Sequence, residues 1–583
     1  MMLSVLPVEI LLEIIQFMPF TTIASLSTLS KSWATLMDTN ESSIYHSISK
    51  RHGYVPKDDS GGTAPPEGWK AWFVQKIQIE LRWIGKLPGH SYRVRVPGTT
   101  GNFHRIKVDE EAGYVINTFT NGGLVVSDIN DHSILWSLDE EFCSPFVHCE
   151  HDEGYIVFNR MDNYKEVWRR RIDVLDIPEE AWPSGLYNKP DEDMIKGNLV
   201  AEDRYLDTNR SRDPDHLRGQ FVPWARLQIP EDGRAFKLTR GTLLVSSVQK
   251  AFLYDVEKAE LQQTIELQPF GSGRLRYVDI SDQHVFIVST LQLDVYDRAN
   301  GSRVLTIPAG RLPWNFYASP ENQWRRTEET FNDGELGFRR AAPPNWADRE
   351  DYFHAAHVSC CGKHLAIMTM SNRIILVQDF WRLFPTLSSS SPPTLIPSPI
   401  TLQHISKQVD FYTERPLLEA EGYLAYYRGK VAGVGIHGVY VLVLDSILDQ
   451  LGEIELLPKD VSLQNLQTKS PEREPSWPNL RLREVEFDLE MFNAEIISCL
   501  QLTETKLYLS VLSDDIMDDR GENMWCCDFA SSPSLSTRDL PAGGDWDAED
   551  SWDWDAGGGW GTEGDWDEVE ARLAGDRRRS GGW

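Results

Sequence analysis

The sequence predicts an α + β multidomain chain, with a short helical module first, a long all-β array after it and a polar tail. Three observations predict this order. Apolar residues recur at helical spacing near the start, short apolar runs ending in aspartate recur from about residue 100, and the end is rich in Asp, Gly and Trp. We divide the 583 residues into segments 1–41, 42–99, 100–530 and 531–583.

The formal net charge of −30 disfavours nucleic acid as a partner, because an acidic surface repels phosphates. No apolar stretch approaches the roughly 18 residues of a membrane span, and Glu9 and Glu13 interrupt the first apolar run, so we expect neither a membrane anchor nor a secretory leader. Seven scattered cysteines predict a reduced chain of the cytosol or nucleus. They are Cys143, Cys149, Cys360, Cys361, Cys499, Cys526 and Cys527.

Segment 1–41 predicts three short helices. Pro7 suits the first turn of a helix, and Glu9 lies where the helix dipole favours a negative charge. We expect a second helix after Thr21 or Thr22, and a third capped by Ser30 or Ser32. The apolar stripes of the first two helices are formed by Ile10, Leu11, Ile14, Ile15, Met18, Ile23, Leu26 and Leu29.

Three helices of this size bury little apolar surface, because domains below roughly 40 residues are usually marginal. Something else must cover the remaining apolar face. That cover is either a partner protein or the downstream domain of the same chain, and the pattern alone leaves both open.

The residues of this segment resemble the F-box. The run Leu6-Pro7-Val8-Glu9-Ile10-Leu11 resembles its L-P-x-E-I-L opening, and Leu29-Ser30-Lys31-Ser32-Trp33 resembles its closing V-S-K-x-W. Leu29 replaces the usual valine, a substitution that cores tolerate. The resemblance covers about forty residues.

The resemblance implies that this module docks on the Skp-type adaptor of a cullin–RING ubiquitin ligase. Trp33 is expected to hold the helices together. By the same resemblance, the adaptor-binding face is formed by Leu6, Pro7, Ile10, Leu11, Ile14, Leu26 and Leu29.

Segment 42–99 predicts a helical linker. Residues 42–52 and 69–87 have helical patterns, and the Gly/Pro/Asp-rich run 57–68 lies between them. The run Glu80-Leu81-Arg82-Trp83-Ile84-Gly85 resembles the connector of F-box/WD-repeat proteins. A stiff connector would fix the distance between adaptor and substrate.

From about residue 100, pairs of short strands recur, and the second strand of each pair ends in aspartate. First strands start at 114, 155, 243, 285, 365, 423 and 507. The shortest steps, 41 and 42 residues, match the roughly 40–45-residue period of a WD-type blade. Because one blade cannot bury both of its faces, the array must close around an axis.

We therefore expect a divergent, WD-repeat-like β-propeller over 100–530, with seven blades as the preferred count and six or eight as alternatives. A pair of β-sandwiches is the alternative architecture. The longer steps contain polar segments that we expect to be edge loops, near 177–226, 309–350, 385–408 and 449–485.

The tail, 531–583, predicts disorder. Its last 43 residues carry 12 acidic and 4 basic side chains and six tryptophans, spaced by Gly and Ala. Either it is a solvated tail, or it presents acidic-aromatic motifs such as Trp552-Asp553-Trp554-Asp555 to a partner groove. The run Arg577-Arg578-Arg579-Ser580 resembles a basic patch or kinase site.

We find no motif that predicts catalysis, a cofactor or a metal. The match to G-x-G-x-x-G at 433–438 precedes a strand, whereas a dinucleotide site needs a helix there, so we expect a glycine-rich hairpin. The set His354, His357, Cys360, Cys361 and His364 has metal-like spacing, but residues three apart in a strand point to opposite faces.

These observations favour a non-catalytic substrate receptor of an SCF-type ubiquitin ligase, with a propeller that binds an unidentified target protein. Holding two reactants together accelerates their reaction without chemistry by the holder. One rival is a propeller scaffold whose N-terminal helices only pack on its own domain. Another is an enzyme with a site in the propeller channel.

Overall fold

In the computed structural model, the described residues lie between Leu6 and Ala530. The longer gaps in this range are 56–64, 206–216, 319–350, 388–394, 397–405, 411–422, 445–480, 488–496 and 512–523, and shorter gaps occur elsewhere. The tail predicted at 531–583 lies outside the described residues.

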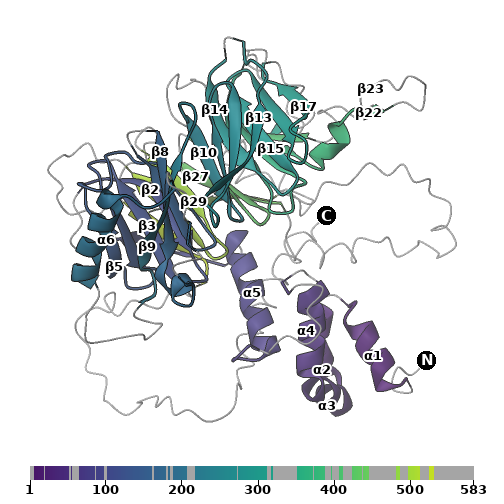
Figure 1. Ribbon diagram of the computed structural model, residues 1–583. Helices are drawn as coiled ribbons and strands as arrows, with labels where there is room; N and C mark the ends of the chain where they lie inside the picture. Colours follow the sequence, from purple (N-terminus) through teal and green to yellow (C-terminus); the bar gives the residue numbers. More distant parts are fainter. Residues whose placement is uncertain are drawn as a thin grey trace, which may run out of the picture.

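Five helices form the N-terminal module, shown in purple in Figure 1. They are α1 (Val8–Ile15), α2 (Phe20–Leu29), α3 (Lys31–Thr39), α4 (Glu41–Arg51) and α5 (Trp69–Trp83). One apolar core joins all five, because Ile15 of α1 and Ile23 of α2 pack in the same cluster as Phe73 and Ile77 of α5. The linker helices therefore cover one apolar face of the first three helices.

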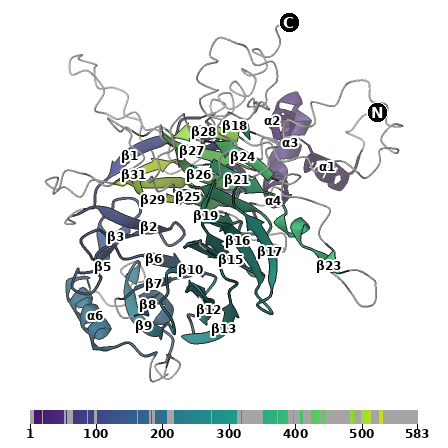
Figure 2. The ribbon, with the colours of Figure 1, turned by 90° about the horizontal axis from the view of Figure 1, so that it is seen from above.

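Seven mainly antiparallel sheets, six with four strands and one with five, follow one another around a ring, which is seen from above in Figure 2. The first four are β2–β5 (Phe103–Asp109, Tyr114–Phe119, Leu124–Asp128, Ile134–Leu138), β6–β9 (Cys149–Asp152, Tyr155–Asn159, Tyr164–Arg170, Phe221–Gln228), β10–β13 (Ala235–Thr239, Thr242–Ser246, Lys250–Asp255, Glu260–Glu266) and β14–β17 (Leu275–Ile280, His284–Ser289, Gln292–Asp297, Arg303–Pro308). The fifth holds β19, β20, β21 and β24 (Phe353–Val358, Leu365–Thr369, Arg373–Val377, Ser406–Asp410), the sixth β25–β28 (Leu424–Tyr427, Lys430–Gly435, Gly438–Val443, Arg481–Val485), and the seventh β29–β31 with β1 (Ile497–Leu502, Lys506–Val511, Met524–Asp528, His90–Val94).

The apolar cores of the β part lie between neighbouring sheets. Seven buried clusters each combine residues of two adjacent sheets, as where Phe286 and Val295 of the fourth sheet meet Ile367 and Ile375 of the fifth. Burial of both faces of every sheet explains the apolar runs in strands such as β20 and β27. The described fold is thus a seven-bladed β-propeller, as predicted, and the sandwich alternative is wrong.

The ring closes through β1, which pairs antiparallel with β31 so that Tyr92 lies opposite Cys526. The seventh blade therefore contains strands from both ends of the propeller sequence. This corrects the predicted domain boundary, because the helical linker was expected to reach residue 99. The sequence of β1 is short and mostly half-exposed, and its partner lies more than 400 residues away, so no local pattern marks it.

Three predicted edge loops contain fourth strands of blades. The segment 177–226 holds most of β9 and the helix α6 (Glu192–Tyr205), 385–408 holds the start of β24, and 449–485 holds β28. In β9, Pro223 argues against a central strand, but β9 is the outer strand of its blade, where proline is tolerated. Two-residue strands also lie in the predicted edge loops: β18 (Tyr317–Ala318), which pairs parallel with β24, lies in 309–350, and β22 (Thr386–Leu387) and β23 (Leu395–Ile396) lie in 385–408.

In the sixth blade the sequence predicts a first strand starting at 423, and a run from Val439 to Asp445 would be its second strand. The structure places β26 between these two strands, and β26 pairs with both. Gly433 and Gly435 belong to β26, and Gly435 lies opposite Gly438 in β27, which confirms the expected hairpin. Glycine has low strand propensity, and this hid β26 in the sequence.

The aspartates that end the predicted second strands have a local role. Asp297 accepts hydrogen bonds from the backbone N–H groups of Ala299 and Asn300, and Asp128 accepts them from Asn130 and Asp131. Each carboxylate thereby starts the turn that leads to the outer strand. Of the helices in the described part of the chain, none is both long enough and apolar enough for a membrane span.

Candidate functional site

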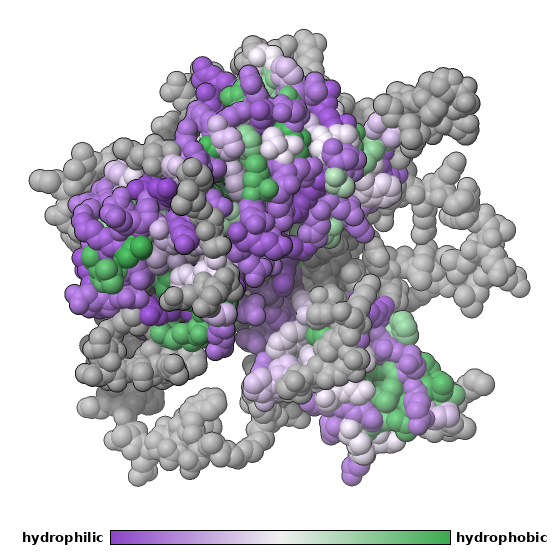
Figure 3. All heavy atoms as spheres, in the orientation of Figure 1, coloured by the Kyte–Doolittle hydropathy of each residue, from purple (hydrophilic) through white to green (hydrophobic). Residues whose placement is uncertain are grey.

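The first candidate site is the outer face of α1. Pro7 precedes this helix, and its carbonyl oxygen accepts hydrogen bonds from the N–H groups of Ile10 and Leu11 at 3.1 Å. Leu11 and Ile15 point into the module core, whereas Val8 and Ile10 are 45% and 47% exposed. Figure 3 shows hydrophobic side chains gathered over this helix.

The seven predicted adaptor-binding residues divide by burial. Leu6, Pro7, Ile10 and Leu29 are exposed, and Ile14 is half-buried. Leu11 and Leu26 are buried, so in this structure they support the module from inside. The exposed part of the predicted set thus lies on α1 and at the end of α2.

Two further apolar residues on the exposed face were not predicted: Val8 and Phe17. Phe17 is 61% exposed, and the Arg51 guanidinium lies 5.0 Å from its ring centre. Arg51 also donates a 2.7 Å hydrogen bond to the carbonyl oxygen of Gln16, which ties the end of α1 to α4. The seven-residue spacing of Phe17 from Ile10 was a signal that could have found it.

Trp33 lies in the first turn of α3. The Ser30 side chain caps α3 by accepting a hydrogen bond from the N–H of Trp33 at 3.3 Å, so Ser30, and not Ser32, starts this helix. The Trp33 ring is half-buried against the module core. The start of α2 differs from the prediction, since it begins at Phe20, before both threonines.

The junction of α5 with the propeller fixes the module in place. The Trp83 ring stacks on Phe529 with 3.7 Å between ring centres, and its Nε1 donates to the carbonyl oxygen of Glu504 at 2.9 Å. Glu80 forms a buried ion pair with Lys430 at 3.0 Å. Trp83 and Ile79 belong to the core between the sixth and seventh blades, so α5 is an extension of that core.

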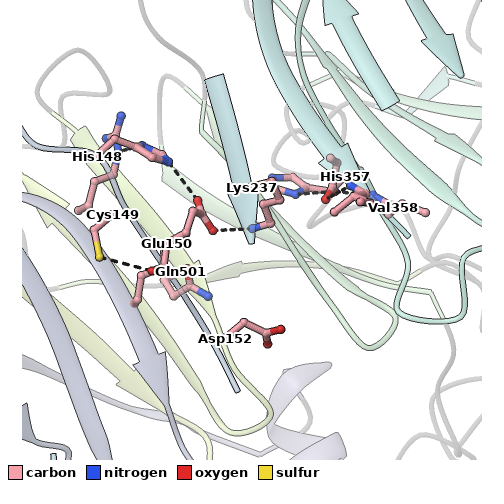
Figure 4. Close-up of polar contacts among 12 residues, drawn as sticks. His148, Cys149, Glu150, Asp152, Lys237, His357, Val358 and Gln501 are labelled. Carbon is pink, nitrogen blue, oxygen red and sulfur yellow. Dashed lines mark hydrogen bonds and ion pairs between the residues drawn. The ribbon is translucent and has the colours of Figure 1, made fainter. Parts of the chain in front are cut away.

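The second candidate site is the channel at the centre of the ring, which Figure 4 shows in part. Its wall is formed by the first strand of each blade, and polar side chains there join neighbouring blades. Glu150 on β6 accepts Lys107 Nζ of β2 at 2.9 Å and Lys237 Nζ of β10 at 3.1 Å. His148 Nε2 lies 3.0 Å from the same carboxylate.

The charged groups around Glu150 compensate one another. Burial alone would raise the pKa of Glu150, but Lys107 and Lys237 outweigh it and hold that pKa well below its usual range. Burial lowers the pKa of His148 to about 4, so its ring is neutral near pH 7. Since Arg105 Nε donates to His148 Nδ1 at 3.3 Å, the ring proton is on Nε2 and is donated to Glu150.

Further polar contacts line the channel at the next blades of the ring. Asp279 of β14 accepts the N–H of Val358 at 2.9 Å, and His357 Nε2 lies 3.0 Å from the carbonyl oxygen of Leu424 on β25. These contacts join the fourth, fifth and sixth blades. The described polar groups of the channel therefore hold the ring together.

The sequence set with metal-like spacing is spread over a strand and a turn. His354 and His357 lie on β19, and Cys360 and Cys361 lie in the exposed turn before β20. Among the described residues, no group of three or more His, Cys, Asp or Glu side chains is arranged to hold a metal ion. All seven cysteines are described, and none forms a disulfide.

Comparisons with known proteins identify the N-terminal module. Residues 3–45 match the F-box domain family. No curated protein matches the chain.

Solved structures similar to this chain include the β-propeller domain of Cps50 (Swd1) from Myceliophteria thermophila, at 8% identity and a TM-score of 0.38, covering 76% of this chain and 99% of that one. The WD40 repeats of RRP9 match at 10% identity and a TM-score of 0.39, covering 75% and 99%. The propeller assignment rests on the strand pairing of this chain and not on these neighbours. The chain thus combines an F-box domain at residues 3–45 with a closed ring of seven blades, a β-propeller.

Proposed function

We propose that this protein is the non-catalytic substrate-recognition subunit of an SCF-type cullin–RING ubiquitin ligase. The F-box would bind the Skp-type adaptor, and the propeller would bind a target protein. The observation that carries the proposal is the exposed apolar face of an F-box domain, formed by Leu6, Val8, Ile10, Phe17 and Leu29. Exposed apolar patches on folded proteins mark binding sites for other proteins.

Two features support the receptor role over a scaffold whose helices only pack on its own domain. The linker helices α4 and α5 already cover the inner face of the module, yet the outer face of α1 stays exposed. The junction at Trp83 holds the module against the propeller, so a bound adaptor and a bound target would keep a fixed spacing.

The absence of disulfides among seven cysteines supports a cytosolic or nuclear location.

The test is co-purification of the full-length chain with the adaptor. Ile10→Asp and Leu6→Asp place a carboxylate in the proposed interface, and we expect affinity to fall by about 100-fold or more, since a lost apolar contact and an unpaired buried charge together exceed about 3 kcal/mol. Leu261→Asp is the matched control, because Leu261 is similarly exposed, at 44%, on β13 of the propeller.

Circular dichroism and thermal unfolding would verify that each variant stays folded. Adaptor binding that survives both Asp variants would contradict the assignment of this face. If the unmodified chain does not bind the adaptor, the proposal of a receptor role is wrong and the scaffold interpretation is favoured.

A further inference from the structure

The helix α6 carries a second apolar surface, far from the F-box. It is inserted between β8 and β9 of the second blade and packs on β5 of the first blade. Met194 and Ala201 are buried in the core between these blades. A Cβ atom on Gly197 would lie 3.1 Å from the Phe142 ring, so the glycine permits the close approach of the helix.

The opposite face of α6 exposes two large aliphatic residues. Ile195 and Leu199 are 49% and 58% exposed, and their four-residue spacing places them side by side on the helix. Figure 3 shows a compact hydrophobic patch framed by hydrophilic residues at the left of the view, where Figure 1 labels α6. The inner face already fastens the helix to the blade, so this patch contributes nothing to its packing.

Negative charge frames the patch. Lys196 and Arg204 are neutralised by Glu141 and Asp139, and Glu202 pairs with Arg171. Glu192 and Asp203 form no ion pair within the described part of the chain. The outer face of α6 therefore fits a segment that combines apolar side chains with positive charge.

The chain contains one such segment at its own end. Residues 572–583 hold four arginines, Leu573 and Trp583 against a single aspartate, whereas the rest of the tail is acidic. The tail follows β31 in the seventh blade, and α6 packs on the adjacent first blade. Between Ala530 and Arg572 lie 41 residues, and a flexible coil of that length has a root-mean-square span of about 35 Å.

We infer that the basic segment 572–583 docks on the outer face of α6. Arg577, Arg578 and Arg579 meet the acidic frame, and the apolar side chains of the segment cover Ile195 and Leu199. A flexible connection of this length gives an effective concentration on the order of 1 mM, so even a weak contact is populated. The inference is independent of the proposed ligase role, because α6 and the F-box lie in different domains.

The test is hydrogen exchange of the α6 amides in the full chain. Replacing Arg577, Arg578 and Arg579 by Gln should accelerate exchange in α6 by about twofold or more at low salt, because docking opposes local opening of the helix. The difference should vanish at about 1 M salt, where the Debye length is about 3 Å. The matched control replaces Asp553, Asp555 and Asp565 by Asn, which changes three charges in the acidic part of the tail and should leave α6 exchange unchanged.

A charge swap makes the test specific. Asp203→Arg should accelerate α6 exchange, and combining it with Arg577→Asp, Arg578→Asp and Arg579→Asp should restore part of the protection. Equal exchange rates in the unmodified chain and the Gln variant would overturn the inference. Protection that rises with protein concentration would also overturn it, because the tail of a second copy would then be the occupant.

Discussion

Glu150 shows how one buried side chain can join three blades. It lies on the second blade and accepts lysines from the first and third, and the carboxylate is almost inaccessible to solvent. A buried charge with its partners in place adds little net stability, but removal of one partner leaves the others uncompensated.

We therefore predict that Glu150→Gln lowers the free energy of unfolding by about 3–5 kcal/mol, because Lys107 and Lys237 lose their counter-charge. Urea unfolding monitored by tryptophan fluorescence would measure the change. Asp282→Asn is the control, since it breaks an exposed ion pair with Arg240 and should cost at most about 1 kcal/mol. Equal costs for the two variants would show that the channel cluster does not hold the ring.

The burial of individual F-box residues could be predicted only in part. The helical spacing of Ile10, Leu11 and Leu26 correctly places them in α1 and α2. Which face turns inward depends on α4 and α5, whose core residues Ile44 and Phe73 come later in the chain. Helical periodicity is a local property, so it does not show which face of a helix will be buried by helices that come later in the chain.

Among the elements, α5 determines how the F-box is held. Its first half completes the core of the helical module, and its last turn enters the core between the sixth and seventh blades. One helix thus belongs to two domains. The Glu80–Lys430 ion pair and the Trp83–Phe529 stack fix its orientation on the propeller.

We predict that Trp83→Ala loosens the module from the propeller while adaptor binding persists. Removal of a fully buried tryptophan typically costs about 3–5 kcal/mol. Small-angle scattering of the full chain should show a larger radius of gyration, and limited proteolysis should cleave near residues 84–89. Trp381→Ala removes a tryptophan that is 51% exposed and should change neither measurement. An unchanged radius for Trp83→Ala would mean that other contacts hold the junction.

The strands that could be predicted are those whose two faces are both buried. The middle strands of most blades, such as β15 and β27, are buried along their length and rich in apolar residues, so they are recognisable in the sequence. First strands carry channel-facing polar residues, as in the Cys149–Asp152 run of β6, and outer strands are half-exposed, so neither type shows a strong pattern. The polar contacts of the channel were missed for this reason, because they are spread over β2, β6, β10, β14, β19 and β25.

For the whole molecule, the pairing of β1 with β31 makes the propeller a closed ring. Every blade buries its faces against two neighbours, and none has a free edge toward the next blade. Loss of one blade junction therefore removes cover from the blades on either side of it.

We predict that Val94→Asp destabilises the entire propeller and not only the seventh blade. Val94 is fully buried between the first and seventh blades, and an unpaired carboxylate there should cost about 3 kcal/mol or more. Hydrogen exchange should accelerate by a similar factor in β30 of the seventh blade and in β15 of the fourth. Leu261→Asp provides the control for an aspartate on an outer strand. Faster exchange confined to the seventh blade would contradict cooperative closure.

Closure by β1 also sets the order of events during synthesis. Asp528 follows Val94 by 434 residues, which a ribosome adds in about 20–90 s at roughly 5–20 residues per second. Throughout this time β1 has no strand to pair with, whereas all the core residues of the helical module have been made once Trp83 has left the ribosome. The nascent chain therefore displays a folded F-box while its propeller is still an incomplete series of blades with an open edge.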